Sequence, residues 1–342
     1  MRLRLVILVL AAIIIGVGSY SGIVNVIKEP IENVIIGYKS PSAWNNRGVD
    51  YVIGKRVAQN DSEAVKWFCK APKQGEVMAQ RNLGLMYAAG KGVPQDNGKA
   101  MQWFRKAALQ NDAVSQLNLG VMYQKGMGTQ QNDREAIKWI HKAAAQGFPE
   151  AERSLGILYS IAENGQQNYV EAFKWLHKAA EKEDAIAQYN LAVMYVTGKG
   201  VRQNDTEAVK WFRKAGKHGD LMAQRTLGLM YATGSNVQQD DFQAMKWFRL
   251  AAKQGDAVAQ YNIGMGFLNG KGVIRNHTKA LKWFHLAASQ GLPQAQYVLA
   301  ALYHDGVSLP QNSMEAIKWL RKAAAQGHLQ AQERLQALVR QD

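Results

Sequence analysis

Residues Ile186 to Leu221 carry one copy of a pattern that fills most of this chain; they read IAQYNLAVMYVTGKGVRQNDTEAVKWFRKAGKHGDL. The tryptophan of this copy belongs to a series whose members lie 36 residues apart. The series consists of Trp67, Trp103, Trp139, Trp175, Trp211, Trp247, Trp283 and Trp319. A fixed period of this length is typical of repeat proteins, in which each unit buries its apolar face against its neighbours. We therefore predict an array of repeats in which these tryptophans belong to the repeat core.

Local signals predict two helices in each repeat. The first helix follows a pair such as Gly255-Asp256, where the aspartate can accept hydrogen bonds from free backbone amides. Its apolar residues recur at helical spacing around a small residue, which implies that another helix approaches closely. The small residues are Gly84, Gly120, Gly156, Ala192, Gly228, Gly264 and Ala300. The second helix begins with a capping box such as Asn204/Glu207 and ends at a glycine such as Gly219.

The array is predicted to cover residues 43–335. Its first unit is a degenerate cap, and residues 330–342 begin one more first helix that closes the other end. The units are 42–77, 78–113, 114–149, 150–185, 186–221, 222–257, 258–293 and 294–329. The fourth unit departs most, because residues 162–165 replace the usual turn and Glu183 replaces the terminal glycine. We expect a local irregularity there.

Two motifs link this pattern to a known family. The stretches LGxMYxxGxGVxQD, from Leu83 to Asp96, and AxxWFRKAA, from Ala100 to Ala108, together resemble the Sel-one-like repeat (SLR), a relative of the tetratricopeptide repeat (TPR). The resemblance implies an all-α, right-handed superhelical solenoid of antiparallel two-helix repeats. It also implies a protein-binding adaptor without catalysis or a cofactor, and many members of the family are exported or surface proteins of bacteria.

The N-terminal residues predict export. Arg2 and Arg4 precede an uncharged stretch, residues 5–27, which is long enough to span a bilayer. Residues 1–27 thus form a signal peptide or a membrane anchor, followed by a connector at 28–42. We favour an uncleaved inner-membrane anchor with the repeats in the periplasm. The alternative is cleavage near Gly16-Val17-Gly18, which would release a soluble periplasmic or secreted protein.

The chain has 42 lysines and arginines against 27 acidic residues, a formal net charge of +15. Many of the lysines lie one residue before or three residues after the repeat tryptophans. Cations late in a helix complement its negative end, which explains this placement structurally. Alternatively, the lysines form a basic convex face that binds anionic lipid or polysaccharide. We favour the structural explanation, and an exported protein is a poor candidate for binding nucleic acid.

No group of residues predicts catalysis, a cofactor or a bound metal. His141, His177 and His285 each stand two residues after a tryptophan, where other repeats have arginine, so they do not form the convergent set that a metal needs. Cys69 is the only cysteine and takes the same position, which leaves an intermolecular disulfide as its only redox chemistry. We therefore expect a protein that is not an enzyme.

One column of the first helices is the candidate partner-binding site. It lies two residues after the first-helix alanine and faces away from the buried stripe. Its members are Arg81, Leu117, Arg153, Tyr189, Arg225, Tyr261 and Tyr297. Arginine and tyrosine are the residues that most often carry binding energy in interfaces. We expect all members except Leu117 to line the concave surface and to contact a partner protein segment. The alternative is that they pack between repeats.

Overall fold

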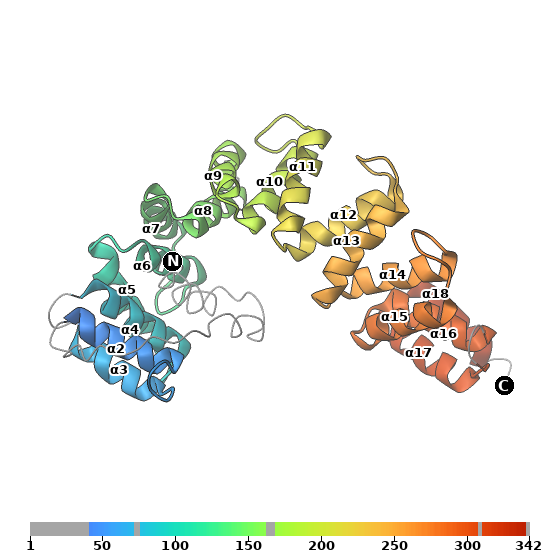
Figure 1. Ribbon diagram of the computed structural model, residues 1–342, viewed down its shortest axis with the longest axis horizontal. Helices are drawn as coiled ribbons and strands as arrows, with labels where there is room; N and C mark the ends of the chain where they lie inside the picture. The colour runs from blue at the N-terminus through green and yellow to red at the C-terminus, as the bar shows by residue number, and fades with distance from the viewer. Residues whose placement is uncertain (1–40, 72–75, 162–167, 307–309, 340–342) are drawn as a thin grey trace. The chain divides into compact units, whose positions relative to one another are not determined.

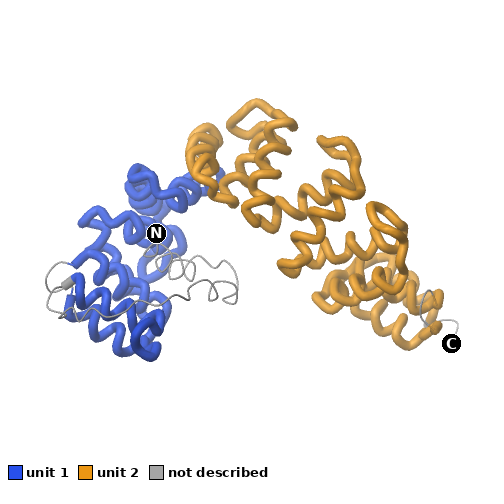
Figure 2. Tube along the Cα trace, in the orientation of Figure 1, with its two compact units in different colours: residues 1–161 blue, residues 162–342 orange. Residues whose placement is uncertain are grey.

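The computed structural model describes residues 41–71, 76–161, 168–306 and 310–339. These residues form seventeen helices and no strand. The prediction of an all-α fold is confirmed. The helices belong to two compact units, one within residues 1–161 and the other within residues 162–342 (Figure 2). Each unit is described by itself.

Unit 1 contains three helical hairpins and the first helix of a fourth (Figure 1). In each hairpin the first helix packs along the second, and the second packs against the first helix of the next repeat. Its helices are α2 (Pro41–Ile53), α3 (Asp61–Lys70), α4 (Val77–Ala89), α5 (Asn97–Leu109), α6 (Ala113–Lys125), α7 (Asp133–Ala145) and α8 (Pro149–Ile161).

Unit 2 begins with a second helix and continues through four hairpins to a closing first helix (Figure 1). Its helices are α9 (Tyr169–Glu181), α10 (Ala185–Thr197), α11 (Asp205–Lys217), α12 (Leu221–Thr233), α13 (Asp241–Lys253), α14 (Ala257–Asn269), α15 (His277–Ser289), α16 (Pro293–Asp305), α17 (Ser313–Ala325) and α18 (Leu329–Val339). Within each unit consecutive hairpins stack on one another, as in a solenoid, and α18 forms at the predicted closing position.

The helix ends follow the predicted capping pattern. The side chains of Asn60, Asn132, Asn168, Asn204 and Asn312 each accept a hydrogen bond from the backbone amide three residues later, at 3.0 or 3.1 Å. In those five repeats the glutamate that supplies this amide pairs through its carboxylate with the lysine three residues further on. Four first helices, α6, α10, α12 and α14, are capped by aspartate, as when Asp256 accepts from the Ala259 amide at 2.7 Å, whereas α4 and α16 begin without a side-chain cap.

The largest fully buried side chains are Phe68, Phe104 and Phe284, each of which follows a repeat tryptophan. Phe284 is fully buried, and a Cβ added at Gly264 would lie 2.7 Å from its ring, so the small first-helix residue makes room for this side chain. The tryptophans divide into two groups. Trp139, Trp211, Trp247 and Trp319 are buried, whereas Trp67, Trp103, Trp175 and Trp283 are half-buried. The residue after the tryptophan is therefore the more central core position, which the sequence analysis did not single out.

Buried glutamines join consecutive hairpins. Gln224 of α12 donates from Nε2 to the Gly216 carbonyl of the preceding second helix at 2.9 Å. Its Oε1 accepts from Gln254, which follows its own second helix, also at 2.9 Å. Equivalent bonds surround Gln116 and Gln296. One glutamine thus bonds to both second helices that flank its first helix, and we call this arrangement the glutamine bridge.

Two expectations concern the fourth unit and the N-terminus. At Glu183 the chain adopts a left-handed φ of 66°, so this residue takes the conformation of the missing glycine, and α9 and α10 keep 13 residues each. The expected irregularity is therefore absent at Glu183, while residues 162–165 lie outside the described residues.

The predicted anchor, residues 5–27, also lies outside the described residues. Within the described part of the chain, every helix falls short of the length and apolar content that a bilayer span requires.

Candidate protein-binding surface

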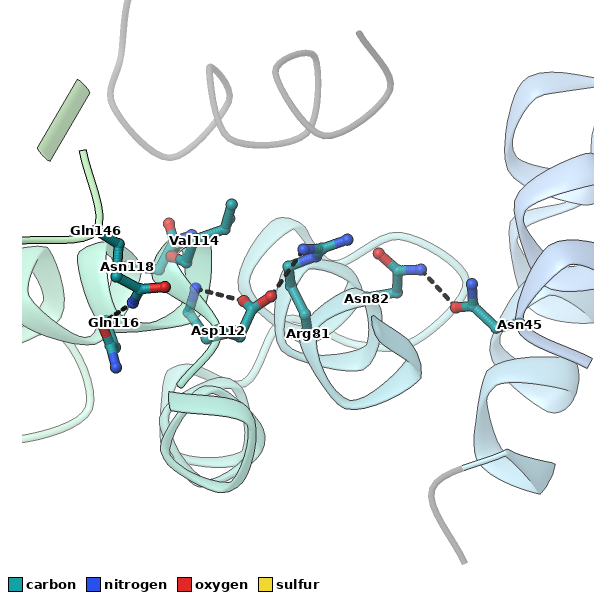
Figure 3. Close-up of polar contacts among 9 residues, drawn as sticks. Asn45, Arg81, Asn82, Asp112, Val114, Gln116, Asn118 and Gln146 are labelled. Atoms are coloured by element: carbon teal, nitrogen blue, oxygen red, sulfur yellow. Dashed lines mark hydrogen bonds and ion pairs between the residues drawn. The ribbon is translucent and has the colours of Figure 1, made fainter. Parts of the chain in front are cut away.

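Two arginines of the first-helix column, Arg81 and Arg225, pair with the aspartate that caps the next first helix. In unit 1, the Arg81 guanidinium lies 2.9 Å from the Asp112 carboxylate, and Arg81 is only 6% exposed (Figure 3). In unit 2, Arg225 lies 3.2 Å from Asp256, and its other terminal nitrogen lies 3.1 Å from the Met222 sulfur. Each aspartate also caps its own helix. These arginines therefore contribute to the contact between repeats, which is the packing alternative raised by the sequence.

The tyrosines of the column remain partly exposed. Tyr189 and Tyr261 pack against Phe212 and Phe284 of their own repeats, with ring centroids 5.6 and 5.8 Å apart. Desolvation raises the pKa of Tyr261. Tyr297 stacks on His328 at 5.0 Å. Each tyrosine is thus held by an aromatic neighbour while part of its ring faces solvent. This geometry suits a preorganised contact residue.

The other two members differ from these. Leu117 on α6 is buried, and Arg153 on α8 is half-buried. The exposure of the column side chains therefore varies along the chain, and the partly exposed tyrosines all lie in unit 2.

The first helices of unit 2 are almost uncharged. Across α10, α12, α14 and α16 the formally charged residues are Arg225, which pairs with Asp256, and Asp305, which pairs with Arg334 at 3.1 Å. The column tyrosines are accompanied by exposed or half-buried apolar side chains, among them Met222 and Leu229 at 39% exposure. Together with Arg225, these side chains form what we call the first-helix surface. It comprises Ile186, Tyr189, Val193, Met222, Arg225, Leu229, Val258, Tyr261, Met265, Tyr297 and Val298.

Neighbouring first helices also contact one another directly, as α12 contacts α14. Axes of helices in contact are about 8–10 Å apart. The partly exposed side chains of successive repeats can therefore form a continuous row. This is the geometry that an extended or helical segment of another protein requires.

The second helices carry most of the charge, and local contacts engage it. Five lysines that precede a repeat tryptophan pair with the glutamate three residues earlier, at nitrogen–oxygen distances of 2.6 to 3.2 Å. The hydrogen bond from Lys318 is the main reason that the pKa of Glu315 is lowered. Six lysines that follow a tryptophan by three residues lie over its ring, with 4.0 to 4.4 Å between nitrogen and centroid. These contacts support the structural explanation of the lysines.

The residues two after the tryptophans also make contacts between repeats. Arg213 of α11 donates to the hydroxyl of Tyr231 in the next first helix. The His285 ring nitrogen lies 2.9 Å from the Tyr303 hydroxyl at the equivalent place. Burial lowers the pKa of His285, because desolvation disfavours its charged form. Arg213 and His285 thus contact a tyrosine hydroxyl at the same place in their repeats. Cys69 occupies the same position and is exposed.

The titratable side chains of the described residues are dispersed over separate helices. In the part of the chain that the structure describes, no three side chains of histidine, cysteine, aspartate or glutamate converge as a metal site requires. His141, His177 and His285 stand on three different second helices.

Comparison with known proteins agrees with this architecture. Among curated proteins none matches the chain. Two solved structures are similar. One is a protective antigen of uropathogenic Escherichia coli strains displaying an SLR fold, with 37% identity and a TM-score of 0.78 over 87% of this chain and 64% of that chain. The other is a Sel1 repeat protein from Oxalobacter formigenes, with 33% identity and a TM-score of 0.71 over 88% of each chain.

The chain thus spans somewhat less than two thirds of the E. coli antigen and most of the O. formigenes protein. The Sel1 repeat itself matches eight consecutive segments. They are residues 46–76, 77–112, 113–148, 149–184, 185–220, 221–256, 257–292 and 293–328. Repeats of this kind are generally non-catalytic and serve as scaffolds for protein–protein interaction. The chain therefore belongs to the Sel1 repeat family.

Proposed function

We propose that this protein is a non-enzymatic adaptor that binds a segment of a partner protein on the first-helix surface of unit 2. One observation carries the proposal. In a chain of net charge +15, this surface holds tyrosines, methionines and aliphatic side chains that are partly exposed, and its single arginine is already ion-paired. Partly exposed apolar residues gathered on one surface are typical of protein-interaction sites.

The proposal places the first helices on the concave side of a right-handed superhelix, as the resemblance implies. Tyr189, Tyr261 and Tyr297 then supply most of the binding energy. Arg225, bound to Asp256, acts mainly by holding neighbouring repeats in register. Arg81 acts in the same way through Asp112. The half-buried Arg153 stays a candidate contact at the end of unit 1.

Site-specific photo-crosslinking in cells tests this function. A photoreactive amino acid replaces Leu229 on the first-helix surface, or Phe242 near the start of second helix α13, which is 64% exposed. We expect a discrete crosslinked product from position 229 and none of that size from position 242. The same product from 242 alone would place the partner on the second helices and contradict the proposal.

We also propose that the protein is anchored in the inner membrane of a bacterium, with its repeats in the periplasm. The support is the uncharged stretch 5–27 behind Arg2 and Arg4. In addition, the similar E. coli protein is a protective antigen. A periplasm-reporting enzyme fused after Lys39 should be active, and the full chain should fractionate with membranes at its unprocessed mass. An inactive fusion would contradict export, and a soluble product beginning near Ser19 would contradict the anchor.

A further inference from the structure

The two kinds of helix differ in charge in a way that defines the partner's chemistry. A net charge of +15 suggests an acidic partner. In unit 2 the lysines and arginines belong mainly to the second helices, where Lys210 and Lys318 pair with glutamate and Lys214 and Lys322 lie over tryptophan rings. The first-helix surface offers one cation, Arg225, and Asp256 neutralises it.

We propose that the first-helix surface binds an uncharged segment with aromatic or aliphatic side chains and discriminates against acidic segments. This inference rests on the proposed function and specifies its partner. A carboxylate buried against Tyr261, Met265 or Leu229 would lose its hydration, while the cation of this surface, Arg225, is already paired with Asp256, so its burial is unfavourable. An apolar side chain at the same place has no favourable hydration to lose, and it buries the exposed parts of these residues.

The spacing of the repeats sets the length of the segment. Neighbouring first helices in contact are about 8–10 Å apart, and an extended chain advances about 3.3 Å per residue. A segment that passes the four first helices α10 to α16 therefore needs on the order of ten residues. This length is available in a random dodecamer library, which serves as the probe.

The experiment selects binders from such a library on the immobilised full-length chain. Affinities of individual peptides are then measured by fluorescence anisotropy at about 50 mM and 500 mM salt, over which electrostatic screening changes severalfold. We expect the selected peptides to carry aromatic and aliphatic residues without net negative charge. Their dissociation constants should change less than about twofold between the two salt concentrations.

A matched pair of variants separates charge from shape. Leu229→Lys and Leu229→Glu place opposite charges at one exposed position of α12, and both should weaken binding by about tenfold, because either charge loses water against an apolar ligand. Phe242→Lys and Phe242→Glu are the controls on α13 and should leave affinity unchanged. Circular dichroism and thermal unfolding confirm that all four variants fold.

Two outcomes would overturn the inference in distinguishable ways. If acidic peptides are selected, if Leu229→Lys strengthens and Leu229→Glu weakens their binding, and if salt abolishes it, the partner is acidic. The adaptor function on this surface would then stand. If the Leu229 variants bind as the unmodified chain does while the Phe242 variants lose affinity, both the inference and the proposed surface are wrong.

Discussion

The first and second helices of unit 2 have nearly equal lengths but differ strongly in the charge of their surfaces. Second helix α11 carries six charged residues in 13, whereas first helix α10 carries none. Lys210 and Lys214 of α11 are engaged in local contacts, whereas neutral side chains of α10 such as Tyr189 and Val193 are partly exposed. Net charge therefore describes the second helices and says little about the surface that is available for binding.

The largest expected effect concerns a core side chain of a second helix. Phe284→Ala should destabilise the protein by about 3–5 kcal/mol, because it removes a fully buried ring. Trp283→Ala should cost less, since its side chain is half-buried. Leu229→Ala on the first-helix surface should stay within about 1 kcal/mol. Urea unfolding followed by circular dichroism measures all three. If Phe284→Ala and Leu229→Ala lowered the free energy of unfolding equally, the contrast between the two kinds of helix would be wrong.

A second prediction concerns helix caps. Asp256→Ala removes both the cap of α14 and the ion pair with Arg225, and we expect a loss of about 2 kcal/mol. Asn276→Ala removes only the cap of second helix α15, which should cost about 1 kcal/mol. The two substitutions should lower the free energy of unfolding by the same amount when each is made in a chain that also carries Arg225→Ala. A difference that persists would show that the ion pair is not its cause.

Replacing an exposed charged residue should change the free energy of unfolding less than removing a core ring or a helix cap. Lys214→Leu removes the cation over the Trp211 ring, and the chain itself has leucine at the equivalent positions 250 and 286. We expect a change of about 0.5–1 kcal/mol in unfolding free energy and unchanged peptide affinity. A loss of affinity comparable to that of the Leu229 variants would show that the second helices take part in binding.

The smallest effect concerns pH. The pKa of His285 is lowered in the fold by burial, so the unfolded chain binds this proton more readily. The stabilisation is fully present above the ordinary histidine pKa of about 6.5 and is lost as pH falls from there through the lower folded value. The unmodified chain should therefore lose slightly more stability between pH 7.5 and 5 than His285→Gln. An identical pH dependence in both proteins would contradict this assignment.

The sequence predicted the helix pairs, their caps and the closing helix because these depend on local, periodic signals. Asn204, Asp256 and Gly219 act within a few residues of their own position. The candidate site was predicted less well. Arg225 has its partner 31 residues away, so only the fold shows that this arginine is already paired. Sequence periodicity places Tyr261 and Arg225 in one column but does not reveal which of them is free to bind.

The sequence also contains a periodic signal for the contact between repeats. Glutamine recurs at 80, 116, 188, 224, 260 and 296, each 36 residues or a multiple of 36 from the last. A polar residue at a constant place beside core alanines indicates a buried hydrogen-bonding role. The structure shows this role in the glutamine bridge.

The glutamine bridge has a consequence for how such a chain can change in length. Gln224 needs a carbonyl from the repeat before it and an amide from the end of its own repeat, and Gln296 needs the same two groups. Each repeat therefore offers its successor the same acceptor that it takes from its predecessor. A repeat that carries this glutamine pair can therefore be duplicated or deleted by recombination without leaving a buried amide unpaired, so the number of such repeats can change while the junctions between them keep their bonds.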